Sequence, residues 1–354
     1  MRLIALLLLA AFCGTASSQQ QAAFPCRFDD KECAAKAVRG HPVTKVAYWQ
    51  NALGVPVEER MGPAPPELVE YLKLDNIKNG YVSKPAAIHP PDDFVGDVRD
   101  AIEETPAAFR RLLAPKLAGI YFVKDLGSTG YSELVLDSAS KPVAGFIALD
   151  AALLARQTAN AWATWKENTA FKSQSGYRLD AEIETAGHDN RRNAIQYILL
   201  HELSHIVAIN ENIHPDWTVE PKNVRSTEPF PFFRLSWSID TAGNRYVTIF
   251  DAKFPQRKDV VYYLDPKLGA AQMVATYANL ERTNFPTLYA ATNPFDDFAE
   301  ALTTYVHTVL MKKPFAIRIY AGGRLARIYR SCWTQQRCAQ KRKLLERLLA
   351  PQSP

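Results

Sequence analysis

The segment His201-Glu202-Leu203-Ser204-His205 combines the residue types and the spacing of a metal-binding helix. Residues four positions apart lie on the same helical face, so the imidazoles of His201 and His205 could bind one metal ion. Zinc suits such a pair, because it accepts nitrogen ligands and its catalytic sites keep one tetrahedral position for water. Glu202 would lie beside that position and could take a proton from the bound water. The pattern is the His-Glu-x-x-His motif.

The residues around the motif indicate that its helix is buried. Residues 194–209 are mostly apolar outside the motif, and a helix that is apolar on all sides belongs in a core. Asp189 or Asn190 could cap its start. Histidine and glutamate side chains in such a helix need partners, since unpaired buried polar groups cost several kcal/mol. Ordinary hydrogen bonds are the alternative, and we favour a metal because it also explains the spacing.

A catalytic zinc usually has three protein ligands, so one more group is needed. A longer motif with a third histidine would require Gly at Ala208 and His at Glu211, which excludes that class. The better candidates are Asp296 and Glu300, which lie four residues apart on a helix predicted from Asn293-Pro294 to about residue 311. One could bind the metal while the other orients a histidine ligand. A capping role would explain Asp296 but not Glu300.

With the downstream segment Tyr289-Ala-Ala-Thr-Asn-Pro-Phe-Asp-Asp-Phe-Ala-Glu300, the motif resembles the zincin metallopeptidases related to anthrax lethal factor and the Pro-Pro endopeptidases. The resemblance extends over residues from about 197 to 305. It implies that Tyr289 stabilises the transition state, that Asp296 is the third ligand and that Glu300 orients a histidine. The family has Glu at the position of Asp296, so a ligand role for Glu300 itself stays open.

Two further side chains lie near the end of the same predicted helix. His307 follows Glu300 by two helical turns and is an alternative to Tyr289 as the hydrogen-bond donor. An ordinary, partly buried histidine is the simpler interpretation of His307. Tyr305 is predicted to belong to the core.

The resemblance and the motif together predict an exported endopeptidase that uses one zinc ion and acts on a protein or peptide substrate. Glu202 would be the general base. One alternative is a zinc-stabilised envelope or binding module without turnover, although a purely structural site has no need of Glu202. Another alternative is an amidase that acts on cell-wall peptides. The oligomeric state stays open.

Residues 1–18 are predicted to be a secretory signal peptide, with an apolar run from Leu3 to Phe12 followed by small residues. The run is too short to span a membrane, and no later stretch approaches its length, so no transmembrane segment is expected. The later cysteines favour the disulfides Cys26–Cys33 and Cys332–Cys338. The predicted location is therefore the periplasm or the outside of the cell.

The chain has 354 residues, of which 47% are hydrophobic, and a net charge of +5, a mild excess that does not indicate nucleic-acid binding. We expect an α+β fold with a small mixed sheet, a buried motif helix and a helical C-terminal lobe. Residues 19–115 would form an N-terminal cap or accessory region, and residues 116–354 a zincin-like domain. The predicted elements are strands at 118–123, 131–136, 143–149, 177–183, 232–239, 246–250 and 260–264, and helices at 67–74, 94–113, 150–165, 268–282 and 323–349. Residues 143–149 could offer an edge to an extended substrate.

Overall fold

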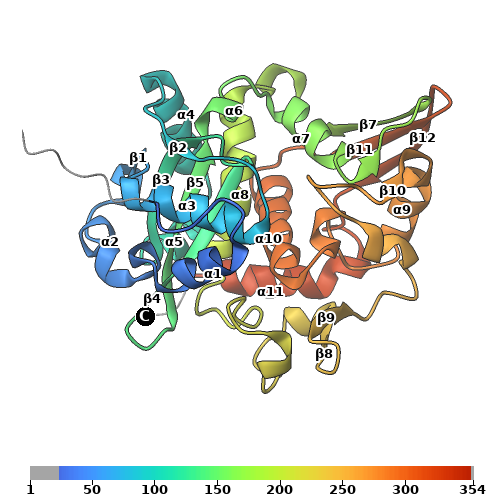
Figure 1. Cartoon of the computed structure of the whole chain (residues 1–354). Helices are drawn as coiled ribbons and strands as arrows, with labels where there is room; N and C mark the ends of the chain where they lie inside the picture. Colours follow the sequence, from blue (N-terminus) through green and yellow to red (C-terminus); the bar gives the residue numbers. More distant parts are fainter. Residues whose placement is uncertain (1–23, 352–354) are drawn as a thin grey trace, which may run out of the picture.

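The computed structural model of the chain describes residues 24–351, and the predicted signal peptide lies outside them. The fold is mixed α+β (Figure 1). Its largest sheet has the order β1-β3-β5-β4, with β2 beside β3. The strands are β1 (Met61–Pro63), β2 (Ala86–Ala87), β3 (Leu117–Lys124), β4 (Gly130–Leu136) and β5 (Pro142–Asp150). The three predicted strands between residues 118 and 149 are thereby confirmed.

The alternation of side chains along β5 explains the two layers of helices around this sheet. Ala144, Phe146 and Ala148 belong to one hydrophobic cluster, whereas Ile147 and Leu149 belong to another, because successive residues of a strand point to opposite faces. The first cluster is covered by α1 (Lys31–Gly40), α2 (Val46–Leu53) and α3 (Pro66–Asn79), and the second by α4 (Asp92–Glu103), α5 (Ala107–Leu113) and α8 (Arg191–Val207). Each face of the sheet is therefore buried.

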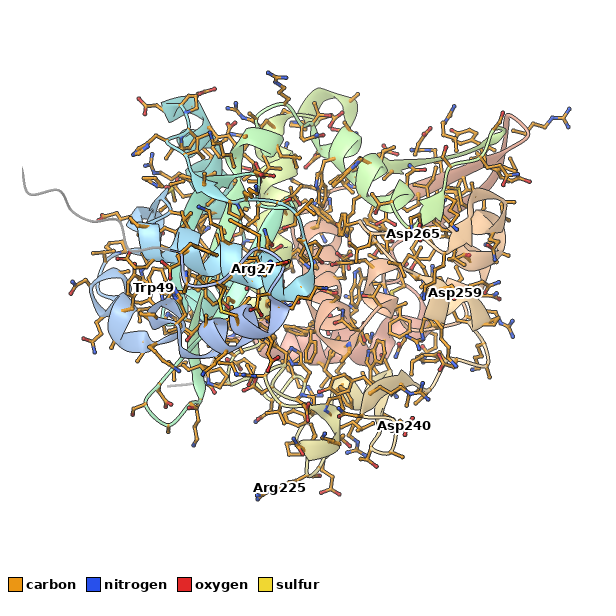
Figure 2. The ribbon with its side chains drawn as sticks, viewed as in Figure 1. Arg27, Trp49, Arg225, Asp240, Asp259 and Asp265 are labelled. Carbon is orange, nitrogen blue, oxygen red and sulfur yellow. A yellow bond between two sulfur atoms is a disulfide. The ribbon has the colours of Figure 1, made fainter. Side chains whose placement is uncertain are left out.

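The N-terminal helices pack closely on the sheet. The indole of Trp49, labelled in Figure 2, lies 5.4 Å from the ring of Phe146 and 5.2 Å from that of Tyr121. β1 pairs in parallel with β3, and β2 pairs with β3 in the opposite direction. The large sheet therefore contains strands from both sides of residue 115. The division of the chain into two regions at that residue stays a prediction.

Strand β4 lies at the edge of the large sheet. It pairs with β5 in antiparallel register, and β5 pairs on its other side with β3. Residues 143–149 are therefore an interior strand and cannot offer the edge that the sequence suggested. Within residues 24–351, the outer edge of β4 carries one isolated bridge, between Leu136 and Lys45.

The rest of the chain forms short strands and helices on the other side of α8 from the large sheet (Figure 1). One sheet has the order β12-β11-β7, and β8 and β9 form an antiparallel hairpin. The strand predicted at 232–239 is extended only from residue 237, because residues 233–235 form a short 3-10 helix. The remaining elements are α6 (Ala151–Leu154), α7 (Ala159–Asn168), β6 (Phe171–Lys172), β7 (Tyr177–Glu182), β8 (Trp237–Asp240), β9 (Arg245–Thr248), β10 (Leu268–Gly269), α9 (Met273–Leu280), α10 (Pro294–Tyr305), β11 (Ala316–Ala321), β12 (Arg324–Arg330) and α11 (Ala339–Leu349).

Two predicted elements are wrong, and others are shorter or interrupted, such as the helix predicted at 150–165, which is broken between α6 and α7. Residues 323–349 are not one helix, because the alternating residues of β11 and β12 pair across a turn in which Gly322 and Gly323 have positive φ angles of 58° and 76°. Residues 260–264 form no strand, since Tyr263 has a φ of 65°, a left-handed conformation that interrupts an extended chain. The helix expected at 268–282 is limited to α9.

Both predicted disulfides, Cys26–Cys33 and Cys332–Cys338, are present. Such bonds persist in oxidising compartments, so they are compatible with an exported protein. Among the helices of residues 24–351, none is sufficiently long and apolar to cross a membrane.

Candidate metal centre

The motif helix α8 is buried between the large sheet and α10, as its apolar sequence predicts. Asn190 caps its start, because the Asn190 side chain accepts a hydrogen bond from the backbone N–H of Asn193. His201 and His205 lie on the same face, with their Nε2 atoms 3.3 Å apart. The helix therefore places both imidazoles as the spacing predicts.

Asp296 from α10 faces the two imidazoles. Its Oδ1 atom lies 3.6 Å from Nε2 of His201 and 3.5 Å from Nε2 of His205. Among residues 24–351, these three residues are the one group of His, Cys, Asp or Glu side chains whose potential ligand atoms lie within 4.8 Å of one another. The structure thus brings together three of the predicted metal-site residues.

The three distances can be compared with those that a zinc ion requires. Zinc bonds of about 2.0–2.1 Å in a tetrahedral site place neighbouring ligand atoms about 3.3–3.4 Å apart. The observed separations of 3.3, 3.5 and 3.6 Å are close to the edges of that tetrahedron. The nitrogen, nitrogen and oxygen donors also suit zinc. This group therefore fits one zinc ion with a fourth position left for water.

The side chain of Asp296 is oriented by its own helix terminus. Asn293 caps α10 and also donates from Nδ2 to Oδ2 of Asp296 over 2.6 Å. Oδ1 of Asp296 is thereby left to face the imidazoles. The shorter side chain of Asp, which departs from the resembled family, reaches the histidine pair from this position.

Glu300 lies on the other side of the His201 ring. Its Oε1 atom is 3.0 Å from Nδ1 of His201, although the ring N–H is not aligned for a full hydrogen bond. Burial raises the pKa of Glu300, but Lys166 and His201 outweigh this effect and lower the pKa to about 2. The geometry therefore favours Asp296 as the ligand and Glu300 as the acid that orients His201.

Lys166, at the end of α7, was missed in the sequence analysis. Its Nζ atom lies 2.8 Å from Oε1 of Glu300, and its side chain is 5% exposed. The same ammonium lies 4.5 Å from the ring centre of Tyr289. A lysine in the apolar helical segment around Trp162 was the available signal, but nothing in the sequence indicated that α7 would contact α10.

The electrostatics of His201 depend on these carboxylates. Burial alone would lower the pKa of its imidazole, but Asp296 and Glu300 outweigh burial and raise the pKa to about 10. A proton and a metal ion compete for the same nitrogen atom. The acids around His201 therefore attract a cation to the centre of the group.

Two hollows adjoin the histidine pair from opposite sides. The first is lined by His201, Glu202, Tyr289, Lys166, Gly130 and Trp162, among others. The second is mostly apolar and is lined by His205, His214, Trp217, Phe230, Leu134 and Ile209, among others. The ring of Tyr289 lies 5.6 Å from that of His201, so the first hollow contains both residues predicted to act on a substrate, Glu202 and Tyr289.

Gly130, at the start of β4, makes room for Glu202. A Cβ atom at Gly130 would lie 2.7 Å from Oε1 and 2.9 Å from Cγ of Glu202. We expect Gly130→Ala to displace the carboxylate and lower kcat about 10²-fold, because catalysis is sensitive to misplacements of about 1 Å. The zinc affinity and the melting temperature should stay near wild type, since a flexible side chain can yield.

Gly96→Ala is the matched control for this prediction, because a Cβ atom at Gly96 would meet nothing within 4 Å. Steady-state kinetics of both variants, with zinc titration and thermal unfolding, provide the test. An unchanged kcat in Gly130→Ala would mean that the position of Glu202 is unimportant.

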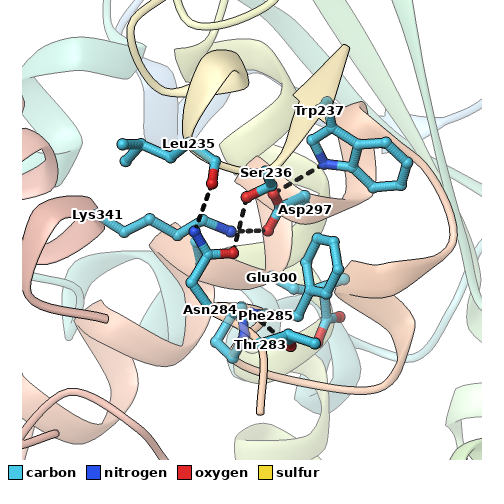
Figure 3. A network of polar contacts seen from close by, with 12 residues as sticks. Leu235, Ser236, Trp237, Thr283, Asn284, Phe285, Asp297, Glu300 and Lys341 are labelled. Atoms are coloured by element: carbon cyan, nitrogen blue, oxygen red, sulfur yellow. Dashed lines mark hydrogen bonds and ion pairs between the residues drawn. The ribbon is translucent and has the colours of Figure 1, made fainter. Parts of the chain in front are cut away.

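His307 and Asp297 do not belong to the group. Nε2 of His307 lies 2.8 Å from the carbonyl oxygen of Ile183, and burial lowers the pKa of His307 to about 4. The simpler interpretation of His307, as a buried histidine with backbone partners, is the one that fits. Asp297 points away from the imidazoles toward Lys341 and Trp237 (Figure 3). Tyr305 is 4% exposed and lies in the core, as predicted.

No family model, no curated protein and no solved structure matches the chain. The resemblance to the lethal factor and Pro-Pro endopeptidase group therefore stays a prediction. The function has to be argued from the centre itself.

Proposed function

We propose that the protein is an exported, zinc-dependent endopeptidase with His201, His205 and Asp296 as the metal ligands. The observation that carries the proposal is the set of three separations, 3.3, 3.5 and 3.6 Å, which one tetrahedral ion would satisfy. Glu202 lies next to the first ligand and lines the adjoining hollow. A structural zinc site has four protein ligands and no use for such an acid.

Each residue of the centre would have a separate role in peptide hydrolysis. Zinc, when bound, would polarise the scissile carbonyl and lower the pKa of a water molecule toward neutrality. Glu202 would accept the proton of the attacking water and return it to the leaving amine. Glu300 would keep the His201 ring oriented, with Lys166 holding the carboxylate of Glu300 in place.

Tyr289 would donate a hydrogen bond to the oxygen that becomes negative in the transition state. Burial is the main cause that raises the pKa of its phenol well above 10, so the hydroxyl stays protonated and available as a donor. A donor of this kind contributes about 3–4 kcal/mol in comparable sites. His307 is not needed for this role.

The edge strand β4 would align the substrate. Among the described residues, its outer edge pairs with no strand apart from the Leu136–Lys45 bridge, so it can add one extended chain, and antiparallel pairing is slightly more stable than parallel pairing. β4 begins at Gly130 beside Glu202 and continues past Leu134, which lines the hollow on the His205 side. An antiparallel substrate would therefore pass His205 first and Gly130 afterwards. This arrangement requires an extended polypeptide.

The test is a digestion of denatured proteins by the purified chain. We expect cleavage that a zinc chelator abolishes and that stoichiometric zinc restores, because the water-activating group is lost with the ion. Peptide fragments are counted by mass spectrometry. A zinc-loaded protein that cleaves no denatured protein would contradict the proposal and favour a non-catalytic binding module. Cleavage confined to cell-wall fragments would favour an amidase.

A further inference from the structure

The hollow beside Glu202 continues into a second one that reaches the N-terminal region. Tyr81, Ser128 and Tyr263 line both hollows. This adjoining hollow is also lined by residues of α3, of the loop after β3 and of the loop before β10: Leu72, Asp75, Asn76, Asn79, Leu126 and Leu264. We call the two together the tyrosine groove. It leads from the metal centre around the start of β4 to the side of the sheet that α3 covers.

One wall of the groove is fixed by the end of α3. Gly80 adopts a left-handed conformation, with a φ of 80°, and the backbone N–H of Tyr81 donates to the carbonyl of Asn76. Such a termination directs the chain sharply away from the helix. The side-chain amide of Asn76 donates to the carbonyls of Ser83 and Leu126. Tyr81 is thereby held at the groove with 42% of its surface exposed.

The opposite wall is fixed by α7. The backbone N–H of Tyr263 donates to Oγ1 of Thr169, and the neighbouring Tyr262 hydroxyl donates to the buried carboxylate of Glu167 over 2.9 Å. Tyr263 has a φ of 65° and is 38% exposed. A left-handed backbone is unusual at a bulky residue, and such strained residues cluster at active sites and ligand clamps.

We propose that the tyrosine groove is a substrate subsite in which Tyr81 and Tyr263 contact the polypeptide beyond the scissile bond; this inference rests on the proposed endopeptidase function. Continuity with the metal centre identifies the occupant, since a chain paired with β4 enters this groove directly after passing Glu202. Leu72, Leu126 and Leu264 add apolar surface. The subsite takes a large apolar or aromatic side chain.

The same geometry disfavours acidic side chains in the hollow that α3 lines. Asp75 lies in its wall, and Lys78, which is 3.0 Å from Asp75, is not among the lining residues. The residues that line this hollow include one carboxylate and no cation, so an acidic substrate residue would meet a like charge and no partner. Because α3 and Tyr81 form one wall of the groove, the N-terminal region would take part in substrate binding.

The experiment uses the zinc-loaded protein and a series of peptides that share one cleavage site and extend progressively further past it. We expect kcat/KM to rise when the peptide becomes long enough to place Phe between the tyrosines, and Glu at that position to remove the gain. Tyr81→Ala should lower kcat/KM about tenfold more for long peptides than for short ones, as for the loss of an aromatic contact. Tyr81→Phe should keep most of the gain.

Val82→Ala is the matched control, because Val82 is 91% exposed and lines neither hollow. A kcat/KM that is independent of peptide length, or an equal loss in Tyr81→Ala for short and long peptides, would overturn the subsite while leaving the proposed function intact. A length dependence confined to residues before the scissile bond would also overturn it. Failure to cleave a peptide of any length would contradict the endopeptidase proposal itself.

Discussion

Glu202→Gln should bind zinc normally and lose most of the peptidase activity, with kcat lower by about 10²- to 10⁴-fold. The amide has nearly the same shape as the carboxylate but cannot accept the proton of the attacking water. The proposed ligands His201, His205 and Asp296 are untouched, so the metal content should stay at one ion per chain. The measurement is kcat on a cleaved peptide together with metal analysis of the same preparation.

Glu59→Gln serves as the control for this variant, because Glu59 is exposed and lies on a separate segment before β1. Its kcat should equal that of the wild type. Full activity in Glu202→Gln would show that another group is the base, and the assigned mechanism would then be wrong. Loss of zinc together with activity would leave the role of Glu202 in catalysis unsupported.

Asp296→Ala should weaken zinc binding more than Glu300→Gln does. Oδ1 of Asp296 lies 3.5–3.6 Å from both imidazole Nε2 atoms, at a distance that one shared ion accounts for. Oε1 of Glu300 lies against Nδ1 of His201 instead. Loss of an orienting partner typically costs about 10- to 100-fold in metal affinity, and loss of a ligand should cost more.

Gln is chosen at position 300 because Lys166 is buried, and complete removal of its partner would destabilise the fold by about 3–5 kcal/mol. Zinc dissociation constants are measured by competition with a chelating dye, and unfolding curves of both variants identify losses that come from misfolding. The reverse order of affinities would make Glu300 the ligand and Asp296 a helix-capping residue.

The sequence was most informative where the relevant contacts are local. The spacing of His201 and His205 determines their common face without knowledge of the rest of the fold. The pattern around Asn293 and Pro294 likewise predicted α10. The three strands before the motif follow from short β-rich runs separated by turn residues. In each case a few neighbouring residues determine the structure.

The contacts that could not be predicted join segments far apart in the chain. Lys166 meets Glu300 across 134 residues, and Gly130 meets Glu202 across the interface of a strand and a helix. Neither contact leaves a pattern in its own segment. The strand β12 was not predicted, because residues 323–349 were expected to form one helix, and its pairing partner β11 was not predicted either. The left-handed backbone of Tyr263 likewise has a distant partner, since its N–H donates to Oγ1 of Thr169.

The last helix of the chain is tied to the metal-site helix by an ion pair with no exposure to solvent. Lys341 of α11 contacts Asp297, which directly follows Asp296 in α10, and both side chains are 0% exposed (Figure 3). Removing one partner of such a buried pair typically costs about 3–5 kcal/mol. The conformation of α11 is therefore coupled to that of α10, so a substitution in α11 would reach Asp296 and the histidine pair without contacting them.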